Sequence, residues 1–182
     1  MRRQTWVLGL AVLGGIGWYA FRPELLFVRT HVNEAAPVAE ATAGATAGAM
    51  SAMSAATEGR VAEGRVAAPA LLTGAFHSVA HETHGHASII RGADGRLVLR
   101  LADFSTSNGP DVRVYLVAAP DAGDNATVTH AGFVELGKLK GTDGDQNYDV
   151  PAGLDLGKYR AVTIWCRRFS VNFATAPLTP LS

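Results

Sequence analysis

A regular alternation of apolar and polar positions recurs from residue 70 onward, and it predicts β-strands. Three stretches show it clearly: GRLVLRLADF, PDVRVYLVAAP and KYRAVTIWC. The apolar residues that share one face are Leu97, Leu99 and Leu101 in the first stretch, Val112, Val114 and Leu116 in the second, and Val162, Ile164 and Cys166 in the third. Since successive side chains of a strand point to opposite faces, each stretch can place one face on a hydrophobic core.

Segments rich in Gly, Asp, Asn and Pro separate these stretches, among them STSNGPD, APDAGDN and GTDGDQ. These residue types favour turns, so the chain is expected to reverse direction at each segment. No amphipathic stretch of helical length occurs after residue 70. The pattern therefore predicts an all-β domain over residues 70–182, an antiparallel β-sandwich of about eight strands.

An uncharged apolar run from Trp6 to Phe21 lies between the pair Arg2-Arg3 and Arg22. As a helix its 16 residues would extend about 24 Å, slightly less than a hydrocarbon core of ~30 Å. We interpret residues 1–29 as an uncleaved signal-anchor with one transmembrane helix, and a cleaved signal peptide is the alternative. Because the arginine pair favours the cytoplasmic side, we expect the rest of the chain to be extracytoplasmic, in the cell envelope or periplasm or at the cell exterior.

Residues 30–69 have low complexity and include ATAGATAG, SAMSA and the tandem EGRVAEGRVA. A segment of Ala, Thr, Gly and Ser with almost no aromatic residues cannot bury enough apolar surface to offset its ordering entropy. We therefore predict a disordered, flexible linker with a mean span of about 35 Å, which would hold the domain off the membrane.

The charge composition excludes one class of partner. Lys and Arg number 16, as do Asp and Glu, so the formal net charge is zero. No overall field attracts the chain to a polyanion, and we expect no nucleic-acid partner. The expected partners are the membrane, through the N-terminal helix, and a redox partner protein.

Cys166 is the only cysteine in the chain, so no disulfide can form within the molecule. In the alternating pattern Cys166 falls on the same strand face as Val162 and Ile164, which predicts an interior position. The apolar row from Phe169 to Phe173 has the opposite parity, so it falls on the other face. The change of parity at Arg167-Arg168 predicts a bulge, a bend or a turn beside the thiol. Two interpretations stay open: a buried thiol that acts as a small hydrophobic residue, and a redox centre, which needs a lowered pKa or a metal.

The order and spacing of DFSTSNGPDVRVYL, LKGTDGDQNYDVP and IWCRRFSVNFATAPL resemble those of the DM13 (DM-thirteen) domain, often labelled an electron-transfer domain. The resemblance covers about residues 72–178. It implies an exported β-sandwich in an oxidising compartment. It also implies a single characteristic cysteine, here Cys166, with a redox or electron-transfer role. Animal relatives often carry a haem-binding companion domain, so haem is expected here only through a partner.

A histidine cluster in FHSVAHETHGHAS offers a second candidate site. Imidazole is the commonest metal ligand near neutral pH, and a hairpin turn at Glu82–Gly85 would make His81 and His86 cross-strand neighbours with His84 at the tip. This arrangement predicts a site for copper or another transition metal at His81, His84 and His86. The alternative is a solvated hairpin whose histidines bind nothing.

The sequence does not identify cofactor-binding residues, and no nucleophile motif, phosphate loop or C-x-x-C-H haem site is present. We therefore expect no conventional enzyme, and at most a redox or electron-transfer protein. The favoured hypothesis is a membrane-anchored, extracytoplasmic electron-transfer domain centred on Cys166. The alternatives are a non-catalytic binding or adhesion module and a histidine-rich metal-binding domain.

Overall fold

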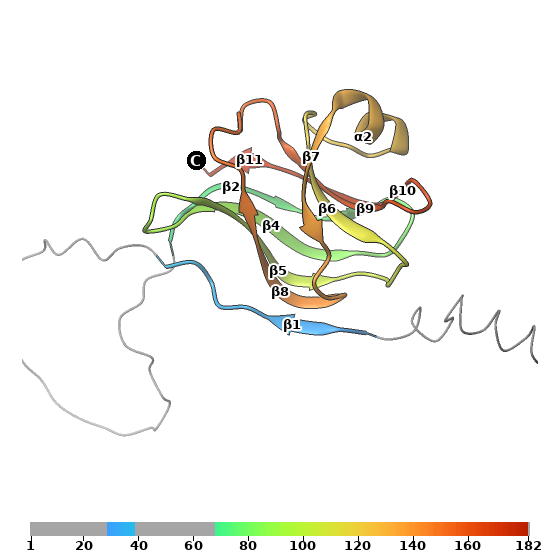
Figure 1. The fold of residues 1–182 in the computed structure, drawn as a ribbon, viewed down its shortest axis with the longest axis horizontal. Helices are drawn as coiled ribbons and strands as arrows, with labels where there is room; N and C mark the ends of the chain where they lie inside the picture. Colours follow the sequence, from blue (N-terminus) through green and yellow to red (C-terminus); the bar gives the residue numbers. More distant parts are fainter. Residues whose placement is uncertain (1–28, 39–67, 182) are drawn as a thin grey trace, which may run out of the picture.

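The computed structural model describes residues 29–38 and 68–181, which form two packed β-sheets (Figure 1). Within these residues the larger sheet contains, in spatial order, β1 (His31–Asn33), β8 (Asp143–Val150), β5 (Leu97–Ser105), β4 (His84–Arg91), β2 (Ala70–Ala75) and β11 (Thr179–Pro180). The smaller sheet contains β3 (His77–Ser78), β10 (Val171–Pro177), β9 (Ala161–Cys166), β6 (Val112–Val117) and β7 (Phe133–Lys138). The predicted all-β sandwich is confirmed, with 11 strands in the described residues instead of about eight.

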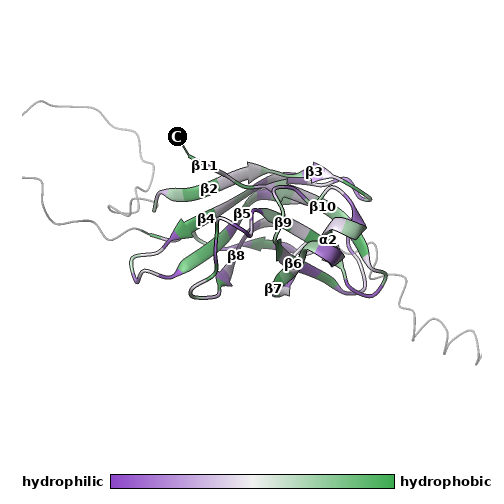
Figure 2. Cartoon of the chain, turned by 90° about the horizontal axis from the view of Figure 1, so that it is seen from above, coloured by the Kyte–Doolittle hydropathy of each residue, from purple (hydrophilic) through white to green (hydrophobic). Residues whose placement is uncertain are grey.

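The core between the two sheets follows the predicted alternation. The fully buried members that the sequence pattern identified are Leu99 and Leu101 of β5, Val114 and Leu116 of β6, and Val162, Ile164 and Cys166 of β9. Figure 2 shows hydrophobic residues interrupted by hydrophilic ones along the strands. Each large apolar side chain that leaves water in this way stabilises the fold by about 1.5–3 kcal/mol.

A second hydrophobic cluster covers the outer face of the smaller sheet. Tyr115 of β6 and Trp165 of β9 pack there, together with Val128 of the short helix α2 (Asn125–Ala131). The carboxylate of Asp124 caps this helix by accepting a hydrogen bond from the backbone N–H of Thr127 at 2.7 Å. The sequence pattern did not predict α2, because seven residues are too few to show a helical repeat.

The prediction that the disordered linker begins at residue 30 is wrong. His31–Asn33 form β1, which pairs in parallel with β8 at the edge of the larger sheet. Close approach of the two strands requires a glycine at position 144: its φ is +93°, and a Cβ there would lie 2.0 Å from the carbonyl oxygen of Val32. The prediction failed because β1 pairs through its backbone and presents no apolar face that alternation could reveal.

Glu34 fixes the residues that follow β1. Its carboxylate accepts hydrogen bonds from Lys140 Nζ at 2.8 Å and from the backbone N–H of Asn147 at 2.7 Å. Partial burial opposes the charge on this carboxyl, but these donors outweigh it and lower its pKa. The ion pair and the strand together hold residues 31–34 on the domain.

Residues 39–67, the rest of the predicted linker, lie outside the described residues, as does the predicted transmembrane helix. The two described segments meet where the backbone N–H of Ala68 donates to the carbonyl oxygen of Pro37 at 3.1 Å. Among residues 29–38 and 68–181, none of the helical structure has the length and apolar character that crossing a bilayer needs.

Candidate functional site

Cys166 is the last residue of β9, and it is fully buried at 0% exposure. It lies opposite Val112 of β6 and Val171 of β10 in the strand register, and it belongs to the core between the sheets. A turn over residues 167–170 follows, in which Ser170 has a φ of +53°. The interior position was predicted from the strand face that Cys166 shares with Val162 and Ile164, and the turn is one of the three irregularities, a bulge, a bend or a turn, that the change of parity predicted.

This burial restricts what the thiol can do in the folded state. A disulfide needs a second sulfur in contact with the first, and oxidation to sulfenic acid needs a peroxide at the same atom. Because Cys166 has no exposed surface, neither a second thiol nor a peroxide can reach its sulfur unless the sandwich opens. Its predicted redox role stays a prediction, and in the folded domain it is limited to the exchange of single electrons.

Three aromatic side chains form a row on the outer face of the smaller sheet, on strands β7, β6 and β9. The rings of Phe133 and Tyr115 are stacked with a centroid separation of 4.3 Å and an interplanar angle of 1°. The ring centroids of Tyr115 and Trp165 are 6.3 Å apart, with an interplanar angle of 26°. Phe133 is 43% exposed whereas Tyr115 is 1% exposed, so the row leads from the surface into the outer cluster. We call these three residues the aromatic row.

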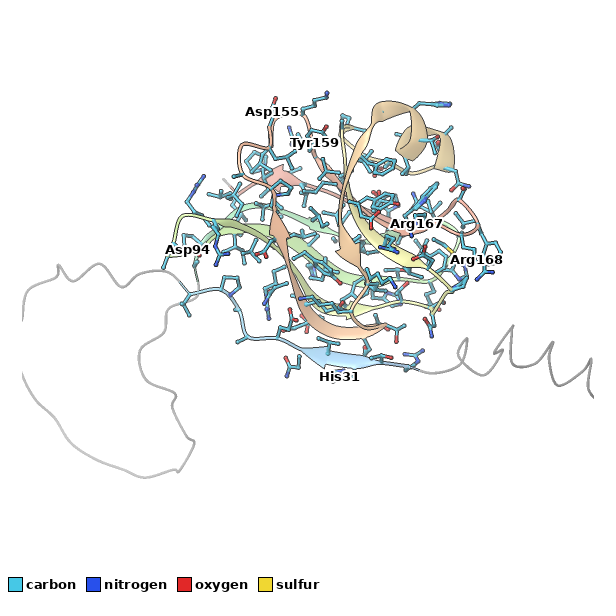
Figure 3. All side chains as sticks on the ribbon, in the orientation of Figure 1. His31, Asp94, Asp155, Tyr159, Arg167 and Arg168 are labelled. Atoms are coloured by element: carbon cyan, nitrogen blue, oxygen red, sulfur yellow. The ribbon has the colours of Figure 1, made fainter. Side chains whose placement is uncertain are left out.

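A compact ion-pair network lies beside the row. Asp111 accepts from Arg113 Nε at 2.6 Å and from Arg167 Nε at 2.9 Å, and Glu135 accepts from Arg113 Nη1 at 2.7 Å. The Arg113 guanidinium beside Asp111 holds the pKa of that carboxyl below its usual value, although partial burial opposes it, and Arg167 acts in the same direction. Arg167, visible with Arg168 in Figure 3, thereby fastens the turn after Cys166 to the start of β6.

The electrostatics of the row favour a neutral phenol at Tyr115. Burial raises the pKa of this hydroxyl, and the negative charge of Glu135 adds to the effect. A tyrosine that loses an electron must also release its proton. An indole can hold the positive charge and keep its N–H, which makes Trp165 the simpler carrier of the two.

The predicted histidine hairpin is wrong. β3 and β4 belong to different sheets, so residues 79–83 cross from the smaller sheet to the larger one. The ring of His81 packs on Phe173 with centroids 3.8 Å apart, His84 contacts Glu82 at 3.1 Å, and His86 pairs with strands on either side of β4. In the part of the chain that the structure describes, no group of three or more His, Cys, Asp or Glu residues is placed to hold a metal ion.

Residues 75–178 match the family described as Electron transfer DM13. The chain belongs to this family. The DM13 match begins at the end of β2, continues through β10 and includes the aromatic row and Cys166, so the resemblance seen in the sequence is confirmed. No curated protein and no solved structure matches the chain.

Sequence reasoning did not identify the aromatic row of this DM13 domain. Tyr115 and Trp165 occupy the outward parity of their strands, which the alternation does reveal. Their proximity depends on the register of β6 and β9, in which Arg113 pairs with Trp165 and Tyr115 with Thr163. Diagonal cross-strand neighbours lie within reach of aromatic side chains, but no residue in the sequence specifies this register.

Proposed function

We propose that this DM13 domain transfers single electrons outside the cytoplasm, on a chain anchored in the membrane by residues 6–21. Membership of an electron-transfer family supports the type of activity. The apolar run supports the membrane anchor, and the Arg2-Arg3 pair before it supports an extracytoplasmic position for the domain.

The aromatic row is the observation that carries the proposal. In the proposed step, a strongly oxidising one-electron centre on a partner protein, such as a high-valent haem, docks at the exposed edge of Phe133 and takes one electron from Trp165. The stacked rings of Tyr115 and Phe133 bridge the two centres without being oxidised themselves, and Trp165 becomes a radical cation that keeps its indole proton. A small one-electron reductant then restores the indole, so one electron enters the domain and one leaves it. No bond forms or breaks in the domain.

Cys166 is the next residue that an electron path through Trp165 could include. It follows Trp165 in β9, and its sulfur lies on the other face of the sheet. A thiol that gives an electron to an indole radical must also release a proton, which the surrounding apolar core disfavours. The aromatic row is therefore the proposed carrier, and the part played by Cys166 is decided by the same experiment.

The test uses the full chain with Trp6 and Trp18 replaced by phenylalanine, so that Trp165 is the only indole. Photogenerated tris(bipyridine)ruthenium(III) serves as the oxidant, and transient absorption follows the indole radical. Tyr115→Phe and Phe133→Leu should each slow formation of the Trp165 radical, by about tenfold for a barrier increase of about 1.4 kcal/mol. Tyr159→Phe is the matched control, since Tyr159 packs against the inner core and not in the row.

Equal rates in all these variants would contradict the proposal and favour the alternative of a non-catalytic binding module. Cys166→Ala in the same assay should leave the rate of radical formation unchanged. If it lengthens the lifetime of the Trp165 radical, the thiol donates to the indole and belongs to the path. An unchanged lifetime assigns Cys166 to the core alone.

A further inference from the structure

The position of β1 brings the folded domain close to the proposed membrane span. Seven residues, 22–28, separate Phe21 from Arg29, and β1 begins two residues later. Since an extended chain covers about 3.5 Å per residue, Arg29 lies within about 28 Å of the end of the apolar run. The low-complexity segment follows β1 in the chain and does not come between the span and the domain.

Three grooves meet at the end of the sandwich where β1 begins. Arg29 borders a groove with Glu82, His84 and residues 105–107. Thr30 borders the next groove, formed by residues 108–112 and 138–142. That groove shares Pro110, Asp111 and Lys138 with a third one, which reaches Arg167 and Arg168. In Figure 3 these two arginines lie at one end of the sandwich, and Asp94 and Asp155 lie at the other.

This end has an excess of positive charge. The third groove is lined by four cationic side chains: Arg113, Lys138, Arg167 and Arg168. Only two carboxylates in the described residues oppose them, Asp111 in the groove and Glu135, which pairs with Arg113 and Arg167. Within residues 29–38 and 68–181, no carboxylate forms an ion pair with Arg29, Lys138 or Arg168. These three cations remain available to an anionic surface.

An exposed aromatic residue lies at the same end. Phe169 is 62% exposed, the largest value for a large apolar side chain in the described part of the chain, and it directly follows the two arginines in the β9–β10 turn. Aromatic rings flanked by basic side chains are favoured at the interface of a bilayer, where the ring meets the acyl boundary and the charges meet headgroups.

We infer that this end of the domain, with Arg29, Lys138, Arg168 and Phe169, rests on the anionic phospholipid surface of the membrane that holds residues 6–21. The inference depends on the anchor in the proposed function and not on electron transfer. Lys138 ends β7 and Phe133 begins it, so the exposed end of the aromatic row then points away from the bilayer, toward a partner protein.

The test uses the full chain in a Cys166→Ala background, reconstituted into vesicles that contain phosphatidylglycerol. An environment-sensitive fluorophore is attached at Phe169→Cys or, as the matched control at the opposite end, at Asp155→Cys. Lipids with a spin label on the headgroup serve as quenchers. We expect several-fold stronger quenching at position 169 than at position 155. The difference should diminish with Lys138→Glu and Arg168→Glu, and in vesicles of phosphatidylcholine alone.

Equal quenching at the two positions would overturn the inference, as would equal quenching at position 169 in both types of vesicle. A label at position 169 that is shielded from aqueous iodide but not quenched by the lipids would mean that a protein covers this end, and would also overturn it. Alkaline carbonate extraction separates the two proposals. If the chain leaves the vesicles, the anchor is wrong and the inference fails with it. If it stays and the ends are quenched equally, only the orientation is wrong.

Discussion

Trp165 and Cys166 are consecutive residues of β9, and their side chains belong to different hydrophobic clusters on the two faces of the smaller sheet. The indole packs with Tyr115 under α2, and the thiol packs between the sheets. The polypeptide backbone of β9 separates them. Chemistry at one of these residues can thus be tested while the other stays in place.

The thiol of Cys166 should react with alkylating reagents only when the domain unfolds. It is fully buried and is the only cysteine in the chain, so any incorporated label reports on this site. The labelling rate should follow the population of the unfolded state, rising steeply with urea through the unfolding transition. Rapid labelling in the absence of denaturant would show an opening of the sandwich at the end of β9.

Cys166→Ser should destabilise the domain more than Cys166→Ala. Serine places a hydroxyl in an apolar core, and an unsatisfied buried hydroxyl costs about 1–3 kcal/mol. Alanine removes only the sulfur and leaves a small cavity, at a cost of about 1 kcal/mol. Urea denaturation of both variants measures the difference. If serine is tolerated as well as alanine, a polar partner reaches this position.

Gly144→Ala should detach β1 from β8. The alanine would have an unfavourable positive φ, and its Cβ would lie against the carbonyl of Val32. Gly153→Ala is the matched control, because Gly153 also has a positive φ, +77°, but a Cβ there meets open space. The control should lose about 1 kcal/mol of stability.

Hydrogen exchange distinguishes the two glycine variants. Amide protection at residues 31–33 should disappear in Gly144→Ala and persist in Gly153→Ala. Since β1 is an edge strand of three residues, the remaining sheet should keep its protection in both. Retained protection in Gly144→Ala would show that the strand pair can separate slightly without breaking.

Asp111→Asn should reduce stability at neutral pH and have a smaller effect in acid. The pKa of Asp111 is lowered in the folded state by Arg113, against partial burial, and by Arg167. Its ion pairs therefore stabilise the domain above the unfolded-state pKa of about 4, and this contribution is lost as the pH falls through the folded-state value. We expect a difference of about 1 kcal/mol between parent and variant at pH 7.

Urea denaturation from pH 7 down to pH 3 measures this difference. Glu82→Gln is the control, because the Glu82 carboxylate is exposed and pairs only with His84 in the described residues, so its removal should have little effect. A difference for Asp111→Asn that stays constant down to pH 3 would contradict the assignment, because it would not depend on the carboxylate charge.

The strands that the sequence identified are those with one face on the core. Leu99, Val114 and Ile164 are completely buried, and hydrophobic burial imposes the alternation that made β5, β6 and β9 recognisable. β1 and α2 were missed for the opposite reason. β1 pairs by its backbone, and α2 contributes one buried side chain, Val128, so neither leaves a periodic pattern.

The candidate site was predicted only in part. The interior position of Cys166 followed from parity alone, which is a local property of one strand. The aromatic row and the ion-pair network depend on contacts between strands distant in sequence, as between Asp111 and Arg167. The hairpin expected at the histidine cluster was wrong for a related reason: residues close in sequence were taken as paired strands, but residues 79–83 change sheets.

The docking of β1 also bears on the repetitive stretch between Val38 and Ala68. A hydrogen bond between Pro37 and Ala68 joins the described residues on either side of it, so the two ends of this stretch lie close together on the domain. Loop-closure entropy changes slowly with length, by about 0.6 kcal/mol for a doubling. The number of tandem copies such as EGRVAEGRVA can therefore change with little penalty to folding. If residues 6–21 anchor the chain as proposed, such a change in length leaves the distance between the domain and the lipid unaltered.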